Sequence, residues 1–509
     1  VPGGGIWLNT QRPEWNDANN GLAGYGLSMV TLFHLRRYLA RLQDVAATLG
    51  SEPIHLSAPV AEWLFAVSAA FGAADPEGRG GADLFHELGR AFGRYRAAAY
   101  ADGLRETTPV DPTALAGLCD AALPHVDATI RANRRPDGLY HSYNLVKFEA
   151  GGDLGVERLP EMLEGQVAAI DSGLLSPHEV ADLVDALFAS GMYAEDRMSF
   201  MLYPARRLPA FLDKNVLPDR TRAISLVASL LDAGDDSLVT ADPDGLVRFA
   251  ADLATRDDVE LVLDRLASDP DWATAVASDR AAVISAYDEV FGHHGYTGRS
   301  GSMYGYEGIG SIYWHMVAKL LVAVQESLGA AQRAGADPAA IDRLADAYER
   351  VRFGLGYNRS ASEFGAIPID PYSHTPAHAG AQQPGMTGLV KEELLTRWLE
   401  LGVAFEDGAI RFDPILLRPD ERLEEPATFQ FLDVEGTATT LELPVGSFGF
   451  TLCQVPFVVR RGDTDSIVVT RRDGSRLEVH GRHLGAGVVG EVYARSGEVR
   501  RVDVQLADA

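Results

Sequence analysis

Hydrophobic side chains recur at helical spacing through most of the chain. From Ser28 to Leu42 they return every three or four positions, and Arg36, Arg37 and Arg41 interleave with them, which predicts an amphipathic helix. Clusters of Gly, Pro, Asn and Asp, typical of helix ends, separate further segments of this kind. We predict these helices at about 57–73, 81–100, 112–133, 177–190, 219–233, 244–255, 257–268, 272–291, 311–334, 337–353 and 386–402. The first 400 residues are therefore expected to be all-helical.

The pattern changes near Arg418, where short β-branched and aromatic runs replace the helical spacing. Turn-forming Asp-Gly and Ser-Gly pairs separate these runs, which lie at 466–470, 476–480 and 491–495. We therefore predict a mainly α protein with a helical region, residues 1–417, and a C-terminal antiparallel β domain, residues 418–509.

Many helices without a sequence repeat fit a bundle, an α-solenoid or an (α/α) barrel, and periodicity does not choose among them. Polar, aromatic-rich connections lie at 11–26, 140–148, 196–209, 293–315 and 357–388. A barrel gathers the loops between its helices at one end. In a barrel, these connections would therefore converge on one pocket.

Composition narrows the choice of ligand. The 509 residues carry a formal net charge of −27, which disfavours nucleic acid and anionic membranes and suits a neutral ligand better. No apolar run approaches the roughly 18 residues that a membrane span needs. Cys119 and Cys453 lack the spacing of a zinc site or disulfide framework, so we expect no metal and a reducing, cytoplasmic location.

The stretch QRPEWNDANN, residues 11–20, crowds Trp15, Asn16 and Asp17 just before the first predicted helix. Helix capping explains one or two of these residues, because Asp and Asn are favoured at helix N-termini. Carbohydrate sites use the same mixture, since a sugar offers flat C–H faces to an indole and hydroxyls to amides and carboxylates. Composition leaves both interpretations open.

Three blocks of sequence resemble one enzyme family. EWNDANNGLAGYGLSMVTLFHLRRYL resembles the Trp-Asn-Asp segment of the inverting β-glucoside phosphorylases of the cellobiose phosphorylase type, glycoside hydrolase family 94 and the related oligoglucan phosphorylases. GYEGIGSIYWHMVAKLLVAVQES is similar to the family's Gly-Ile-aromatic-x-His stretch. PGMTGLVKEELLTRWLELGVAFEDGAIRFDPIL is similar to its Thr-Gly dipeptide, helix and Gly-Val, Asp-Gly and Asp-Pro passage. The blocks follow the family's order.

The resemblance implies an (α/α)6-barrel-type catalytic region followed by the β domain. The stretch 50–290 has no counterpart in the family and is expected to contain an insertion. The family's N-terminal part is also missing, and the chain begins with Val1, so we expect a preceding portion or a partner chain. The sequence is also compatible with a homodimer.

The implied reaction is cleavage of a β-linked gluco-oligosaccharide by inorganic phosphate, with inversion, to give α-glucose 1-phosphate. Phosphate is then a co-substrate, and no cofactor is expected. Inverting hydrolysis needs two carboxyl groups about 6.5–9.5 Å apart, one of them to activate water. Phosphate is itself a nucleophile, so one protein acid suffices.

The resemblance places the general acid at Asp17 and a phosphate site at Thr387 and Gly388. A hydroxyl with backbone N–H groups beside a helix start suits phosphate. His374 joins this site only by proximity. The expected substrate-binding residues are Arg12, Glu14, Trp15, Asn16, Glu307 and His315.

Several of these residue assignments have an alternative interpretation. Glu307 is either the base of an inverting hydrolase on the same fold or a residue that bonds loop amides. His315 is also consistent with a packing histidine, and His374 with a proline-ordered loop. Phe200 and Tyr203, in the unmatched stretch, either line extra sugar subsites or pack against the barrel. Besides a phosphorylase and an inverting hydrolase, a third hypothesis is that the chain is a non-catalytic carbohydrate-binding subunit.

Overall fold

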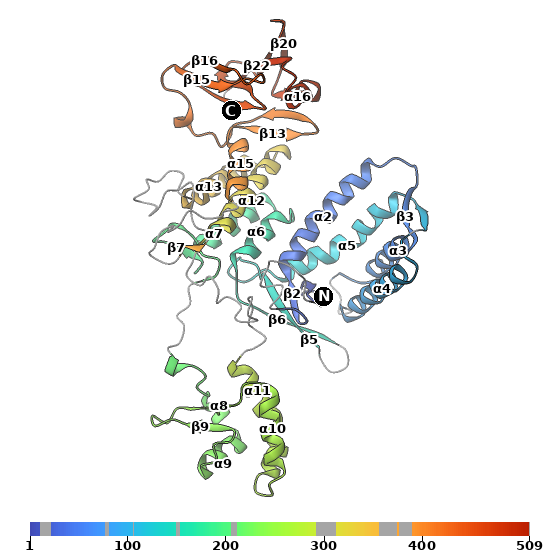
Figure 1. The fold of residues 1–509 in the computed structure, drawn as a ribbon, viewed down its shortest axis with the longest axis vertical. Coiled ribbons are helices and arrows are strands. Elements are labelled where there is room, and N and C mark those ends of the chain that lie inside the picture. Colours follow the sequence, from blue (N-terminus) through green and yellow to red (C-terminus); the bar gives the residue numbers. More distant parts are fainter. Residues whose placement is uncertain are drawn as a thin grey trace. The chain divides into compact units, whose positions relative to one another are not determined.

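The computed structural model describes residues 1–10, 22–76, 81–104, 106–148, 153–204, 211–291, 312–355, 374–375 and 389–507. Two compact units divide the chain. Unit 1 comprises Val1–Tyr313 with His374–Gly380, and unit 2 comprises Trp314–Ser373 with Ala381–Ala509 (Figure 1). Within the described part of the chain, no helix is long and apolar enough to cross a membrane.

A four-stranded antiparallel sheet organises the first part of unit 1. Its strands, in spatial order, are β1 (Ile6–Trp7), β2 (Gly26–Ser28), β5 (Tyr143–Phe148) and β6 (Leu154–Arg158). Ser28 ends β2 and caps the helix that follows, because its Oγ accepts a hydrogen bond from the Thr31 N–H at 3.0 Å. A buried strand therefore separates the polar segment that contains Asp17 from the first helix.

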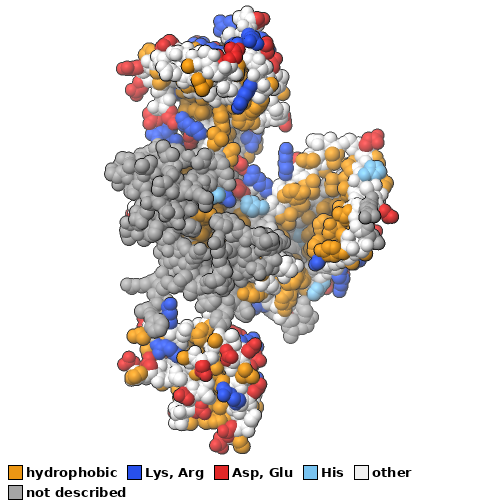
Figure 2. All heavy atoms as spheres, viewed as in Figure 1, with side chains coloured by type: hydrophobic (Ala, Val, Ile, Leu, Met, Phe, Trp, Pro, Cys, Tyr) orange, Lys and Arg blue, Asp and Glu red, His pale blue; other side chains and the backbone are white. Residues whose placement is uncertain are grey.

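Helices and a two-stranded antiparallel sheet accompany this sheet. The helices are α2 (Met29–Thr48), α3 (Ala58–Ala73), α4 (Gly81–Asp102), α5 (Thr113–Ala132) and α6 (Leu163–Asp171), and the two-stranded sheet pairs β3 (Ile54–Ser57) with β4 (Thr107–Val110). Buried Phe33 of α2 packs edge-on against buried Tyr140, with ring centroids 5.9 Å apart. Figure 2 shows hydrophobic side chains gathered over the lobe formed by α2–α5, where Trp63, Phe65 and Phe92 are exposed.

The rest of unit 1 includes a subdomain with a hydrophobic core of its own. Before it come α7 (Pro177–Phe188), β7 (Tyr193–Ala194) and β8 (Ser199–Phe200). The subdomain contains η1 (Phe211–Asp213), α8 (Asp219–Arg222), α9 (Ser225–Ala233), β9 (Val239–Ala241), β10 (Val247–Phe249), α10 (Arg256–Ala267) and α11 (Ala273–Phe291). After it come β11 (Ile312–Tyr313) and β12 (His374–Thr375).

The described part of unit 2 contains helices and a β domain. The helices are α12 (Trp314–Arg333), α13 (Pro338–Gly354) and α15 (Leu389–Glu400), and α16 (Ala486–Tyr493) lies within the β domain. A five-stranded sheet has the order β17 (Ser447–Leu452), β18 (Val455–Gly462), β22 (Val499–Ala507), β19 (Ser466–Arg471) and β20 (Arg476–His480). The smaller sheets are β13 (Val403–Glu406), β14 (Ala409–Phe412) and β21 (His483–Leu484), and the hairpin β15 (Ala427–Leu432) with β16 (Ala438–Leu443). A short η3 (Pro419–Glu421) precedes β15.

The prediction that the first 400 residues are all-helical is wrong, because small sheets interrupt the helices. Residues 244–255 were expected to be helical but contain β10, in which Val247 and Phe249 are buried on either side of Arg248. The Asp242 carboxylate accepts hydrogen bonds from the Asp244 and Leu246 N–H groups and so stabilises the turn between β9 and β10.

Two predictions about the β domain also need correction. Residues 491–495 were expected to be a strand, yet α16 runs to Tyr493, because Val489 and Val492 are buried at helical spacing. The domain is not purely antiparallel, since β18 and β22 pair in parallel. The long connection between them, which includes α16, makes that pairing feasible. The (α/α)6-barrel-type arrangement stays a prediction.

The third sequence block forms the junction between α15 and the β domain. Gly402 has a φ of +76°, and its carbonyl accepts a hydrogen bond from the Asp413 N–H at 2.7 Å. Asp407 and Gly408 form the turn of the β13–β14 hairpin, with φ values of +48° and +78°. Buried Val403 belongs to the core of the β domain. These matched residues therefore have structural roles.

We predict that Gly402→Ala destabilises unit 2 more than Gly436→Ala does. Both glycines have positive φ, +76° and +77°, so each substitution incurs the left-handed penalty of about 1–2 kcal/mol. A Cβ at Gly402 would also overlap the backbone of Pro414, whereas nothing lies within 4 Å of one at Gly436. The added overlap is expected to cost about 1–3 kcal/mol more in urea unfolding. Equal losses for the two variants would contradict this account.

Candidate functional site

Most of the predicted site residues lie outside the described residues. These are Arg12, Glu14, Trp15, Asn16, Asp17, Glu307, Thr387 and Gly388. The structure describes the backbone of His374, as part of β12, and it describes His315, in the first turn of α12. It also describes the elements that flank the other site residues in the sequence.

Backbone hydrogen bonds tie together the two flanks of the segment that contains Asp17. The Leu8 N–H donates to the Gly26 carbonyl at 2.8 Å, and the Gly24 N–H donates to the Leu8 carbonyl at 2.6 Å. β1 and β2 continue this pairing in antiparallel register. Leu8 and Gly24, which flank this segment, therefore lie side by side next to β1 and β2 of the four-stranded sheet.

A second series of contacts links this sheet to the flanks of the other site segments in unit 1. The Ser142 carbonyl, just before β5, accepts from the Met29 N–H at 3.0 Å, and the Ser142 hydroxyl donates to the Met162 carbonyl at 3.2 Å. The Leu163 N–H in turn donates to the Leu202 carbonyl at 2.9 Å. The start of α6 therefore joins the N-terminal sheet to the segment after β8.

The segment after β8 pairs with β11, and β11 pairs with β12. Met201 forms an antiparallel bridge with Ile312, and Ile312 and Tyr313 pair with Thr375 and His374. His374, which was only a proximity assignment, therefore lies in register beside Tyr313. The chain passes directly from Tyr313 into α12, whose second residue is His315. In α12, His315 is partly buried, and Val317, Leu320, Leu321 and Val324 form a buried apolar face.

Phe200 and Tyr203 are buried, at 1% and 5% exposure, which agrees with the packing alternative for these residues. The Phe200 ring contacts Phe188 and Tyr193, with centroids 4.9 and 5.5 Å apart. These contacts hold β8 against α7, immediately before the Met201 bridge.

In unit 2, a buried carboxylate connects α13 with α15, the helix that follows Thr387 and Gly388 in the sequence. The Glu400 side chain, 4% exposed, accepts hydrogen bonds from Arg352 Nε at 2.8 Å, from the Tyr348 hydroxyl and from Arg397 Nη1 at 2.9 Å. Gln325 of α12 donates to the Thr396 carbonyl at 2.9 Å. The three helices are therefore held together by one buried polar network.

Burial sets the protonation states in this network. Desolvation, reinforced by the Glu400 carboxylate, raises the pKa of Tyr348 far above its ordinary value, so the hydroxyl stays protonated and donates to Glu400. Desolvation also raises the pKa of Glu349, although Arg352 and Arg418 oppose this shift. Sequence reasoning missed this network. Tyr348 and Arg352 share a helix face, but nothing in their spacing points to Glu400.

The subdomain between β8 and β11 is built around buried aliphatic and aromatic side chains. The Tyr287 ring packs 5.2 Å from Phe249, and its hydroxyl donates to the Leu253 carbonyl at 2.9 Å. Because Met201 pairs with Ile312, the stretch that carries the subdomain begins and ends at neighbouring positions. This is the arrangement expected of a domain inserted into a host fold.

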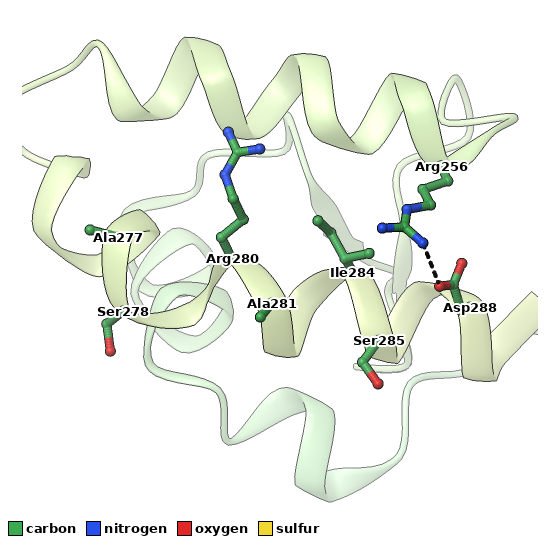
Figure 3. Close-up of a pocket in the computed structure, with 8 residues that line it drawn as sticks. All are labelled: Arg256, Ala277, Ser278, Arg280, Ala281, Ile284, Ser285 and Asp288. Atoms are coloured by element: carbon green, nitrogen blue, oxygen red, sulfur yellow. Dashed lines mark hydrogen bonds and ion pairs between the residues drawn. The ribbon is translucent and has the colours of Figure 1, made fainter. Parts of the chain in front are cut away.

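A depression of about 560 Å³ lies on the surface of the subdomain between α10 and α11 (Figure 3). Arg256 there is bonded to Glu260 at 3.0 Å and to Asp288 at 3.4 Å, and Arg280 is paired with Asp264. Among the described residues that line it there is no aromatic ring, and neither His315 nor His374 is one of them. It therefore lacks the flat apolar face that a sugar ring would contact.

Comparison with known families finds a similarity for this subdomain. Residues 208–294 match the family model for GH149 phosphorylase insertion domain 2. The match overlaps the C-terminal part of the stretch 50–290, in which the sequence predicted an insertion, and extends four residues beyond it. It indicates a glycoside phosphorylase, and hence an enzyme of carbohydrate metabolism, but it does not point to the cellobiose phosphorylase type specifically. Comparison with curated proteins gives no match.

We predict opposite effects of two Glu→Gln substitutions in unit 2. Glu400→Gln leaves the buried Arg352 guanidinium without its carboxylate and is expected to cost about 3–5 kcal/mol of unfolding free energy. Glu349→Gln removes a carboxylate that burial disfavours, so it should stabilise the protein at pH 7.

The sign of the Glu349 effect depends on pH. The raised pKa means that wild-type stability falls as pH increases above the unfolded value of 4.5 and through the folded pKa. The gain from Glu349→Gln should therefore shrink as the pH is lowered toward 4.5. Urea unfolding at several pH values measures it, and a gain that does not depend on pH would contradict the assignment.

One buried and one exposed leucine of α10 offer a matched test of the subdomain core. Leu263 is 0% exposed and Leu261 is 62% exposed. Leu263→Ala should cost about 2–5 kcal/mol, whereas Leu261→Ala should stay within about 0.5 kcal/mol. Hydrogen exchange of α10 and α11 amides in the full chain measures the difference. Similar exchange in both variants would contradict the described core.

Proposed function

We propose that this protein cleaves a β-linked gluco-oligosaccharide with inorganic phosphate, inverts the anomeric centre and releases α-glucose 1-phosphate. The observation that carries the proposal is the match of residues 208–294 to an insertion domain of GH149 phosphorylases. It supports the same chemistry as the three sequence blocks, and it comes from a part of the chain that those blocks do not cover. The phosphorylase assignment therefore has two independent supports.

In the proposed reaction, Asp17 donates a proton to the glycosidic oxygen while a phosphate oxygen attacks the anomeric carbon from the opposite face. The C–O bond to the leaving sugar breaks, and that sugar departs with its hydroxyl restored. Trp15, Asn16, Arg12 and Glu14 hold the sugars on either side of the bond. A single protein acid suffices because phosphate provides the nucleophile.

The remaining predicted residues complete the two binding sites. Thr387 and Gly388 seat the phosphate, with His374 beside them, while Glu307 and His315 contact substrate. The described anchors support part of this proposal, since the flanks of the Asp17 segment, the Met201–Ile312 bridge and β12 belong to unit 1. The proposed scaffold is an (α/α)6-barrel-type region, and the proposed location is the cytoplasm.

The decisive measurement is the phosphate dependence of cleavage. With gluco-oligosaccharides of several β-linkages, the protein should form α-glucose 1-phosphate only when phosphate is present. Equal cleavage in phosphate-free buffer would instead support the inverting hydrolase, and binding without turnover would support the non-catalytic subunit.

Asp17→Asn should lower kcat for phosphorolysis by about 10²–10⁴, the usual contribution of a positioned general acid. Asp44→Asn is the matched control, because the Asp44 side chain is 69% exposed on α2. It should leave kcat unchanged. Comparable rates for Asp17→Asn and wild type would reject Asp17 as the acid.

A further inference from the structure

Helix α3 is apolar almost all round, yet much of it is exposed. Glu62 is its only ionisable residue, and three of its residues are buried: Pro59, Ala61 and Leu64. A helix with so little polar surface is normally covered on every side. In α3, however, Trp63 and Phe65 are 38% and 51% exposed. The described fold therefore leaves a large part of an apolar helix uncovered.

Helix α4 extends this apolar surface. The Trp63 ring lies 6.4 Å from the Phe92 ring and 5.6 Å from the Tyr95 ring, and Phe92 is 44% exposed. Phe85 lies on the same side of α4 as Phe92, because residues seven apart are separated by about two helical turns. The surface belongs to the lobe over which hydrophobic side chains gather in Figure 2. Contiguous exposed apolar patches of this kind mark interaction surfaces.

The charged side chains of α4 indicate which partner fits this surface. Four exposed residues lie on one side of the helix, at successive spacings of four, three and four: Asp83, Glu87, Arg90 and Arg94. The two acidic residues come first and the two arginines come last, so the charge reverses at the middle of the row. A second copy of α4 in antiparallel orientation therefore presents the opposite charge at each position. The row is complementary to itself, as a two-fold interface requires.

One register pairs all four charges. When the two-fold axis passes through the midpoint of the row, next to Gly89, Asp83 lies opposite Arg94 of the second copy. Glu87 then lies opposite Arg90 of the second copy, and both pairs form twice. Complementary charges of this kind fix the register and orientation of an interface.

The same axis also pairs the aromatic side chains of α4. Phe85 and Phe92 are centred on the same point of the helix as the charged pairs, so Phe85 of one copy lies opposite Phe92 of the other. Gly89, beside the axis, is exposed, and nothing lies within 4 Å of a Cβ added there. Two helices can therefore approach each other closely at this point.

We propose that the exposed face of α3 and α4 is an interface between two copies of this chain, in which the two α4 helices pack in antiparallel orientation. The charged row lies along one side of the contact, and the aromatic row, continued by Trp63 and Phe65 of α3, lies along the other. The proposal concerns assembly and does not depend on the proposed function.

Charge reversal with rescue tests the interface in the full chain. Arg94→Glu sets two carboxylates opposite each other, twice in each dimer, so the dimer Kd in sedimentation equilibrium should rise about tenfold or more. Adding Asp83→Arg to Arg94→Glu restores opposite charges and should return Kd to within about threefold of wild type. Arg41→Glu is the matched control, because the Arg41 side chain is 77% exposed on α2. It should leave Kd unchanged.

Cysteine substitutions at two glycines of α4 locate the axis. Gly89 and Gly93 are both exposed, and nothing lies within 4 Å of a Cβ added at either position. Gly89 lies beside the axis, whereas the two copies of Gly93 are about 14 Å apart along the helices. Mild oxidation should therefore cross-link two chains that carry Gly89→Cys, while Gly93→Cys should cross-link no more than wild type.

Several outcomes would overturn the proposal. A wild-type chain that stays monomeric at every concentration would mean that another segment or partner covers this face. A dimer that Arg94→Glu does not weaken would have its interface elsewhere. If the double variant does not regain wild-type affinity, or if both cysteine variants cross-link equally, the antiparallel register is wrong. None of these outcomes bears on phosphorolysis, which is measured separately.

Discussion

The pairing of β2 with β1 on one side and β5 on the other is the constraint on which the first part of unit 1 depends. All three residues of β2 are buried, so their backbone groups must find partners within the protein. Gly26 and Ser28 pair with β5, and Ser28 and Leu27 pair with β1. Ser28 also caps α2, so one short strand both joins two neighbouring strands and starts the helix after it.

In unit 2, a buried charged side chain likewise needs partners within the protein. A carboxylate as deeply buried as Glu400 is stable only when several donors surround it, and α13 and α15 supply them. Just after Glu400, at the same end of α15, Gly402 turns the chain sharply into the β13–β14 hairpin. Asp413, which follows the hairpin, bonds Arg411 at 2.8 Å and Arg482 at 3.3 Å. Helix and β domain are therefore joined by a stiff connection in which polar groups are paired.

The sequence predicted the long elements well and the short ones poorly. The helix from Ser28 was predictable because its apolar and arginine positions recur with a helical period over about four turns. β1, β2 and β5 were missed, since strands of two to six residues are too short to show a clear period, and residues 140–148 look like a polar connection. The partners of Glu400 were hidden for another reason. They lie 48 and 52 residues away, and only the fold brings them together.

The candidate site could be predicted only in part from residue chemistry. Composition around Asp17 left helix capping and sugar binding equally open, and only the resemblance of whole blocks assigned it a role. Within the third sequence block, the structure then showed which residues have a structural role. Gly402, Asp407 and Gly408 are explained by backbone geometry, so their presence supports the fold and says nothing of catalysis.

The bridge between Met201 and Ile312 has a consequence for how such an enzyme could change over time. The residues that lead into and out of the subdomain, Met201 and Ile312, are neighbours, and the subdomain has a hydrophobic core of its own. Gain, loss or exchange of the subdomain therefore leaves the register of β8 and β11 unaltered. Relatives could therefore differ by this whole subdomain and still conserve the same surrounding scaffold.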